Sequence, residues 1–252
     1  MKPNRLQRLW SEGRVAANAW LGLADGFAAE IVALGGFDSV VFDLQHGMAA
    51  SADLPRLLQG VSSSEVVPLV RVPANEPAMI MRALDAGAMG VIVPMVETAE
   101  QAAAAVSAAR YPPAGSRSFG PTRAARLHGP EYHLHADAEV IVFCMVETRR
   151  GLDNLDAIAA VEGLTGLYVG PADLSYAVGV PPRMDSDDAA QVAAVARILA
   201  ACGENGIVAG IHTADTAFAR RKADEGFGFV TVAVDTAALA AETARRLAAF
   251  RA

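Results

Sequence analysis

Two acidic residues, Glu147 and Asp173, directly follow two successive apolar segments of this 252-residue chain, at 140–146 and 166–172. About one helix of sequence separates them, so in a parallel array of strands and helices both carboxylates would reach the same rim. An ionised carboxylate is costly to bury unless it is paired or bound to a metal. Oxygen ligands suit hard divalent cations, so the two acids predict a Mg²⁺ or Mn²⁺ site. The alternative is that both acids merely cap helix N-termini.

Four more candidates for chemistry lie at the ends of the preceding apolar segments. Asp43 and Gln45 alternate onto one face, and His46 lies at the turn that follows. A histidine on a barrel rim titrates near neutrality and can move protons, although a lone histidine is more often structural. Arg71 ends the next segment, where a buried guanidinium requires an anion or a carboxylate such as Asp43 or Glu147.

A 2-oxo acid that chelates a metal would use all of these groups at once. The segment Gly170–Ser175 opens a helix, and its free N–H groups can bind a carboxylate. The keto oxygen would then face the metal and Arg71, and the C3 proton would face the base. Removal of that proton gives an enolate whose charge the metal and the arginine stabilise.

Short apolar segments alternate with helical patterns along the chain, as expected for βα units. We predict eight strands, near 17–23, 39–44, 66–72, 90–96, 140–147, 166–169, 207–212 and 229–234. The predicted helices are 25–34, 53–61, 76–86, 98–109, 152–161, 187–202, 213–225 and 236–250, with a further short helix over 4–12. Near-continuous β-branched strands indicate a parallel sheet buried on both faces.

These eight units predict one (β/α)8 TIM barrel domain over residues 1–252. The alternative, an open doubly wound sheet, usually has a glycine fingerprint after its first strand, and the turn at 22–26 lacks one. Segment 111–137 is too long for a passive connector, and we expect it to be a lid on the catalytic rim or part of a subunit contact. Its histidines do not complete a transition-metal site, and three of its other residues are candidates for contacting an aldehyde: Ser116, Arg117 and Arg123. His212 ends strand seven and is expected to line the substrate pocket.

Composition excludes several other classes of protein. The net charge is −7 with no basic block, which argues against a nucleic-acid partner. No hydrophobic run approaches the roughly 18 residues of a membrane span, and the N-terminus is not a signal core, so a cytoplasmic protein is expected. The two lysines, Lys2 and Lys222, end no strand, which excludes Schiff-base, P-loop and pyridoxal-phosphate chemistry. Cys144 and Cys202 make no disulfide framework.

Five segments taken in order resemble the metal-dependent (class II) 2-oxo-acid aldolases of the HpcH/HpaI family, typified by 4-hydroxy-2-oxoheptanedioate aldolase. They are 43–47, 70–71, 93–98, 145–148 and 169–175, and the similarity spans nearly the whole chain. The resemblance implies a barrel of the phosphoenolpyruvate/pyruvate type and reversible cleavage of 4-hydroxy-2-oxo acids to pyruvate, or a related 2-oxo acid, plus an aldehyde. It also implies a divalent metal (Mg²⁺ or Mn²⁺, with Co²⁺ or Zn²⁺ as substitutes) and a homohexamer, a trimer of dimers that exchange their C-terminal helices.

The resemblance also implies roles for individual residues. Glu147 and Asp173 become the metal ligands, Arg71 the enolate stabiliser, and His46 the base, acting directly or through water on the metal. The remaining assignments are Asp43 in the catalytic set, Asp85 supporting the histidine across the dimer, and pyruvate-facing backbone at Gly170, Pro171, Ala172 and Asp173. Several relatives carry Glu in place of Gln45, which makes this site less acidic.

Two other functions compete with the aldolase. An acyl-CoA carbon–carbon lyase of the citrate lyase beta-like branch shares the barrel and the carboxylate pair, but an acidic chain with two lysines offers little basic surface for CoA. A catalytically silent barrel that serves as a binding protein would not need the arginine, the histidine and both carboxylates together.

Overall fold

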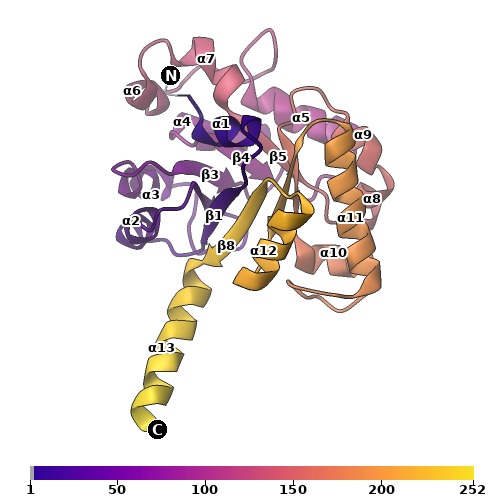
Figure 1. Ribbon diagram of the computed structural model, residues 1–252. Coiled ribbons are helices and arrows are strands. Elements are labelled where there is room, and N and C mark those ends of the chain that lie inside the picture. The colour runs from indigo at the N-terminus through magenta and orange to yellow at the C-terminus, as the bar shows by residue number, and fades with distance from the viewer. Residues whose placement is uncertain (1–2) are drawn as a thin grey trace.

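The computed structural model describes residues 3–252, and within them eight parallel strands form a closed barrel in chain order. Each strand pairs with the next, and β8 pairs with β1. The (β/α)8 barrel predicted from the sequence is therefore confirmed (Figure 1). The strands are β1 (Ala16–Leu21), β2 (Ser39–Asp43), β3 (Val67–Arg71), β4 (Gly90–Val93), β5 (Ile141–Met145), β6 (Gly166–Val169), β7 (Val208–His212) and β8 (Phe229–Val234).

Helices surround the barrel, and several begin at a side-chain cap, such as Asp25 before α2 and Thr98 before α5. The predicted helix 152–161 is divided in two at Asn154, whose side chain donates to the carbonyl of Glu97. The helices are α1 (Arg5–Ser11), α2 (Gly26–Ala33), α3 (Leu54–Gly60), α4 (Pro77–Asp85), α5 (Ala99–Ala109), α6 (Ala124–His128), α7 (Tyr132–Glu139), α8 (Arg149–Asp153), α9 (Leu155–Ala159), α10 (Pro171–Ala177), α11 (Ala189–Glu204), α12 (Thr216–Glu225) and α13 (Asp235–Arg251).

The strand period of two decides which side chains fill the barrel. Inward positions carry large apolar side chains, and the rings of Phe143 and Phe229 stack with centroids 5.3 Å apart. Helix α1 closes the amino-terminal end of the barrel, where Leu6 and Leu9 are buried and Trp10 donates to the carbonyl of Gly228 at 2.8 Å. The outward positions form a second apolar layer beneath the helices. Because the interior is apolar and α1 closes the amino-terminal end, a polar site is expected at the carboxyl end of the barrel.

Segment 111–137 lies at the wrong end of the barrel for a lid. It follows α5, which returns the chain to the amino-terminal rim, and it contains α6 and α7 at the same end as α1 (Figure 1). The expectation of a lid over the site of its own subunit is therefore wrong. Arg117 is fully buried there and donates to Asp85 and to the hydroxyl of Tyr132, so it does not contact substrate in its own subunit.

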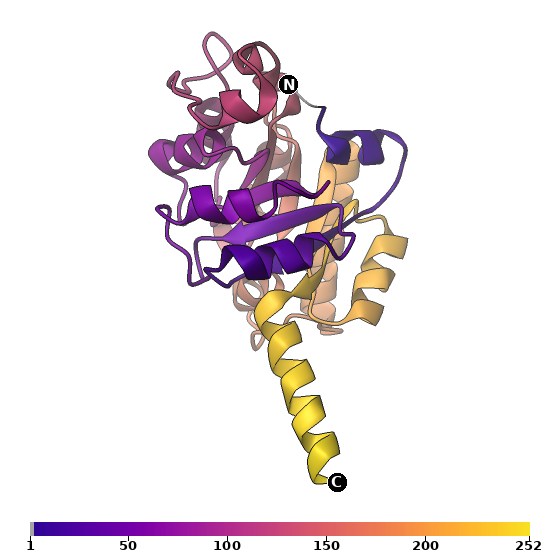
Figure 2. The ribbon, with the colours of Figure 1, turned by 90° about the vertical axis from the view of Figure 1, so that its left-hand side faces the viewer.

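Helix α13 projects away from the barrel from the carboxyl end of β8 (Figures 1 and 2). None of its side chains is buried, and its apolar residues Leu239, Leu247 and Phe250 are exposed. An exposed apolar stripe also lies on and just after α2, at Phe27, Ile31 and Leu34. Within residues 3–252, no helix has both the length and the apolar character needed to cross a membrane.

Candidate active site

The carboxyl end of the barrel brings together most of the residues that the sequence singled out. Asp43, Arg71 and His212 are the last residues of β2, β3 and β7, and alternation turns them inward. Glu147 follows β5, and α10 begins directly after Gly170. One pocket joins these elements, and it is lined by Trp20, His46, Arg71, Met145, Glu147, Tyr168, Gly170, Pro171, Ala172, Asp173, Met184 and His212.

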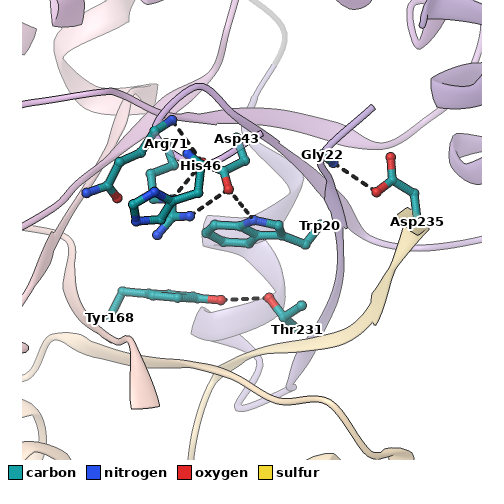
Figure 3. Close-up of polar contacts among 9 residues, drawn as sticks. Trp20, Gly22, Asp43, His46, Arg71, Tyr168, Thr231 and Asp235 are labelled. Atoms are coloured by element: carbon teal, nitrogen blue, oxygen red, sulfur yellow. Dashed lines mark hydrogen bonds and ion pairs between the residues drawn. The ribbon is translucent and has the colours of Figure 1, made fainter. Parts of the chain in front are cut away.

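Asp43 and Arg71 form a buried, bidentate ion pair (Figure 3). Arg71 Nε donates to Oδ1 at 2.9 Å and Nη2 donates to Oδ2 at 2.6 Å. The carboxylate also accepts from Trp20 Nε1 at 3.1 Å and from the backbone N–H groups of Gln45 and His46. Burial acts to raise the pKa of Asp43, but the hydrogen bonds and charge of Arg71 and the other donors outweigh it and hold the pKa below its usual value. Asp43 is thus ionised at neutral pH, and its carboxylate orients the groups that donate to it.

The Nη1 group of Arg71 is available to bind a ligand. Nε and Nη2 bind Asp43, while Nη1 makes no protein hydrogen bond among the described residues, and the side chain lines the pocket. The guanidinium carbon lies 4.9 Å from the centre of the Trp20 ring. The ion pair and the stacking fix the planar group, so its free edge can stabilise an oxyanion without reorganising.

His46 lies on the turn after β2, between two hollows of the rim. Its backbone is fastened by Asp43, whereas its side chain is exposed and lines both the main pocket and an adjoining one beside Gly47 and Met48. The neighbouring Gln45 has a buried Oε1 atom with no hydrogen-bond partner in the described structure. A base in this position can reach substrate from the solvent side of the pocket.

Glu147 is the buried acid of the site. Its Oε1 accepts the backbone N–H of Met95 at 3.0 Å, and its buried Oε2 has no hydrogen-bond partner among residues 3–252. Met95 has φ of 56°, a left-handed conformation that is uncommon for a residue other than glycine. Burial, aided by the charge of Asp173, raises the pKa of Glu147 to about 7, while the Met95 N–H and Arg71 oppose the rise. An unpaired oxygen in this setting calls for a cation or a proton.

The donor set at this point fits a hard divalent cation. Asp173 lies in the first turn of α10, close enough to Glu147 for the two charges to interact. A Cβ at Gly170 would overlap Glu147 Oε2, so the glycine leaves room for that oxygen. No group of three His, Cys, Asp or Glu residues between 3 and 252 could hold a metal. A cation here would have two protein carboxylates, with substrate and water as its other ligands.

His212 is held as a neutral imidazole. It is half-buried, and its ring meets the Trp20 ring edge-on, with centroids 4.8 Å apart. Burial lowers the pKa of His212 to about 4; the Arg71 charge acts in the same direction and Asp43 opposes it. At neutral pH this histidine therefore adds a polar but uncharged wall to the pocket.

Asp85 is a predicted site residue that the fold does not bring to the pocket, and the same holds for Ser116, Arg117 and Arg123. Asp85 ends α4, shortly before β4 begins, and so lies at the amino-terminal rim. There it accepts from Arg117 at 2.8 Å. A role beside His46 would need a second subunit, as the resemblance implied, and it remains a prediction.

Four pocket residues were not expected from the sequence: Trp20, Met145, Tyr168 and Met184. Trp20 sits at an inward position of β1, and strand alternation alone could have indicated it. Tyr168 stacks on Trp20 with ring centroids 5.6 Å apart, and its hydroxyl bonds Thr231 at 2.7 Å (Figure 3). Met184 comes from the loop between α10 and α11, and no local pattern signals its position.

A closed (β/α)8 barrel whose carboxyl-end rim joins a carboxylate pair, a fixed arginine and a histidine has the architecture of a carbon–carbon lyase of the aldolase type. The chain belongs to the HpcH/HpaI aldolase/citrate lyase family, whose model matches residues 17–241. The family expected from the sequence motifs, and with it an enzyme of the aldolase type, is thereby confirmed.

Similarity to individual proteins extends over the full length. The chain is 39% identical over 249 residues to a hydroxypyruvate/pyruvate aldolase of Rhizorhabdus wittichii, covering 99% of each chain. It is 35% identical over 251 residues to a 5-keto-4-deoxy-D-glucarate aldolase of Salmonella paratyphi A, covering 99% of this chain and 97% of the relative. A crystal structure of a family member from Burkholderia cenocepacia matches with a TM-score of 0.92 and 36% identity, covering 98% of this chain and 99% of the other.

Proposed function

We propose that the protein is a divalent-metal-dependent aldolase that reversibly cleaves 4-hydroxy-2-oxo acids to pyruvate, or a close 2-oxo acid such as hydroxypyruvate, plus an aldehyde. The observation that carries the proposal is the unpaired, buried Oε2 of Glu147, which lies beside Gly170 and near Asp173. Names of full-length relatives supply the substrate class, a 2-oxo acid. Mg²⁺ or Mn²⁺ suits two carboxylates better than a softer metal does.

The substrate is held between the α10 amino terminus and Arg71. Glu147 and Asp173 hold the cation, which, when bound, lowers the energy of negative charge on the keto oxygen. The backbone at Gly170, Pro171 and Ala172, together with the start of α10, faces the substrate carboxylate. The free edge of Arg71 takes the keto oxygen, and its attachment to Asp43 keeps it aimed there.

His46 moves the protons of the reaction. In the cleavage direction it accepts the proton of the 4-hydroxyl, the C3–C4 bond breaks, and the aldehyde forms from C4. The bonding electron pair passes to C3 and the C2 oxygen, where Arg71 stabilises the enolate that results. Return of a proton to C3 gives the 2-oxo acid. Addition of pyruvate to an aldehyde follows the same path in reverse, beginning with loss of a C3 proton to His46.

We further propose that the active form is a homohexamer, a trimer of dimers that exchange α13. The support is that no side chain of α13 is buried and that apolar Leu247 and Phe250 face solvent on a single copy. Light scattering of the purified protein would give the mass of six chains if this is right. A monodisperse monomer would contradict it, and it would also remove any role for Asp85 at the site.

Exchange of pyruvate methyl protons in deuterated water tests the proposed chemistry without requiring a known aldehyde. We expect exchange that depends on added Mg²⁺ or Mn²⁺, that stops with chelator, and that is lost in Glu147→Ala and Asp173→Ala. His46→Ala should slow exchange by about 10² to 10⁴ while leaving pyruvate binding nearly intact. Exchange that persists at the wild-type rate after exhaustive chelation would reject the metal, and unchanged exchange in His46→Ala would reject the base.

An acyl-CoA carbon–carbon lyase is the competing function. Of the two lysines, Lys222 is buried against Glu225 on α12, so it offers no free cation for CoA phosphates. A thermal-shift titration with CoA discriminates the two, because a ligand that binds only the folded state raises the melting temperature. A clear upward shift with CoA, together with no exchange of pyruvate protons, would favour the lyase.

A further inference from the structure

Asp235, the first residue of α13, binds the turn after β1 with both carboxylate oxygens. Oδ1 accepts the N–H of Gly22 at 2.9 Å (Figure 3). Oδ2 accepts the N–H of Leu23 at 3.0 Å. Oδ1 also accepts the N–H of the following Thr236 at 2.7 Å. Asp235 is half-buried, and its contacts with Gly22 and Leu23 join residues more than 200 positions apart in the chain. Asp235 thus fastens the end of β8 to the end of β1.

The same turn holds the segment that carries His46. The carbonyl of Gly22 accepts the N–H of Met48 at 2.8 Å. This carbonyl and the N–H of Leu23 belong to one peptide unit, so a single peptide plane is bound by Asp235 on one edge and by Met48 on the other. Hydrogen bonds arranged in this way polarise and strengthen one another. Loss of the Asp235 carboxylate should therefore also weaken the hydrogen bond from the Met48 N–H to the Gly22 carbonyl.

Close backbone packing makes the connection stiff. A Cβ at Gly47 would overlap the carbonyl oxygen of Asp43 and approach that of Gly22 to 3.2 Å, so the main chains of the two turns lie close together. The His46 turn is held from the inside by Asp43, through the N–H groups of Gln45 and His46, and from the outside by Gly22.

The residues on either side of Asp235 lie beside the His46 turn. Val234 and Thr236 line the hollow next to His46, together with Gly22, Gly47 and Met48. Helix α13 itself contributes no buried side chain that could fasten this region. The carboxylate of Asp235 is therefore the anchor through which the start of α13 meets the rim.

We propose that Asp235 is a positioning residue for the reaction, which sets the place of the His46 turn through the peptide plane between Gly22 and Leu23. The inference rests on the proposed role of His46 as the base. Asp235 does not touch the reacting atoms. Its loss acts on the rate of proton transfer and not on the binding of the 2-oxo acid or the metal, because residues at other strand ends bind these.

Proton exchange of pyruvate separates these effects. We expect Asp235→Ala to lower kcat for exchange by about 10-fold or more, because small displacements of a reacting group reduce rates strongly. KM for pyruvate and the affinity for Mn²⁺ should change by no more than about twofold, since Arg71, Glu147 and Asp173 are untouched. Asp235→Asn should behave similarly, because its NH₂ group would face a backbone donor.

Asp215 provides a matched control. It follows β7, caps α12 and accepts two backbone N–H groups, from Ala217 at 2.8 Å and Phe218 at 3.0 Å, but it lines neither hollow of the rim. Asp215→Ala should lower the melting temperature, as expected for a missing N-cap, yet exchange protons at the wild-type rate. Equal losses of kcat in the two alanine variants would overturn the inference.

A double-mutant cycle identifies the path of the effect. If Asp235 acts through His46, then adding Asp235→Ala to His46→Ala should lower the remaining exchange by less than about twofold. The same loss in both backgrounds would show that Asp235 acts elsewhere and would overturn the proposal.

Amide hydrogen exchange of the metal-free protein tests, independently of activity, whether Asp235 anchors the His46 turn. Peptides that cover 44–48 should exchange faster in Asp235→Ala than in wild type, and those in Asp215→Ala should not. If wild-type protein fails to exchange pyruvate protons at all, the proposed function falls, and the amide data alone judge the anchor. Unaltered protection at 44–48 in Asp235→Ala would overturn the anchor even in an active enzyme.

Discussion

The Glu147 carboxylate lies against the backbone of Gly170, in the space that a side chain at Gly170 would fill. The two residues follow β5 and β6, which are neighbours in the barrel with Met145 opposite Tyr168. Their approach requires glycine for steric reasons rather than for backbone freedom, since φ of Gly170 is −96°. A single missing Cβ thus decides whether Glu147 Oε2, the oxygen proposed to face the metal, has room.

Gly170→Ala should therefore disrupt metal binding while leaving the barrel folded. The added methyl group would displace Glu147 Oε2, and we expect Mn²⁺ affinity by calorimetry to fall at least about 10-fold, since one of two carboxylates is moved. Gly203→Ala is the matched control, because nothing lies within 4 Å of a Cβ at that position on α11. Equal affinities in the two variants would mean that Glu147 does not hold the metal.

The raised pKa of Glu147 predicts how metal-free protein responds to pH. Between about pH 4.5 and 7 the folded state keeps a proton that the unfolded state has lost, so the contribution of this residue to stability is full at low pH and declines as pH rises to about 7. Glu147→Gln should match wild type near pH 4.5 and exceed it by about 3 kcal/mol at pH 8. Urea denaturation with chelator present measures the difference, and parallel curves for the two proteins would contradict it.

His212 should have the opposite dependence. With its pKa near 4, the unfolded state binds a proton between about pH 6.5 and 4 that the folded state does not, so stability falls as pH decreases through this window. The loss is about 3 kcal/mol and should be absent in His212→Gln. A histidine titration followed by NMR would place the His212 midpoint below pH 5. A midpoint above 6 would contradict the lowered pKa and with it the expected loss of stability at low pH.

Arg71→Lys tests the need for the planar guanidinium. Lysine keeps the charge but cannot bind Asp43 with two parallel hydrogen bonds and still present a donor to the enolate. We expect kcat for pyruvate proton exchange to fall by about 10²-fold, as for the loss of an oxyanion donor, with a much smaller change in KM. If only KM changes, Arg71 anchors the ground state and does not stabilise the enolate.

The sequence was sufficient for features that depend on local pattern. Strand alternation and strand ends predicted the barrel, the inward Asp43 and Arg71, and the placement of Glu147 at the rim. The expectation that segment 111–137 lies on the catalytic rim fails because α5, directly before it, returns the chain to the other rim.

Contacts between distant elements left no local pattern to read. The bond from Trp20 to Asp43 depends on the register of β1 against β2, and the arrival of Met184 depends on how a loop packs. The left-handed conformation of Met95 accompanies the hydrogen bond from its amide to Glu147, which is distant in the sequence. The neutrality of His212 likewise arises from burial beside Trp20, which a strand-end position does not reveal.

The exposure of the side chains of α13 also affects how the free energy of unfolding must be measured. If its apolar side chains, such as Phe250, are covered only when another copy of the chain binds them, part of the free energy of folding is free energy of association. The melting temperature would then rise with protein concentration by mass action. Dilution into an assay could release subunits during the measurement, so specific activity would depend on enzyme concentration and on the time elapsed since dilution.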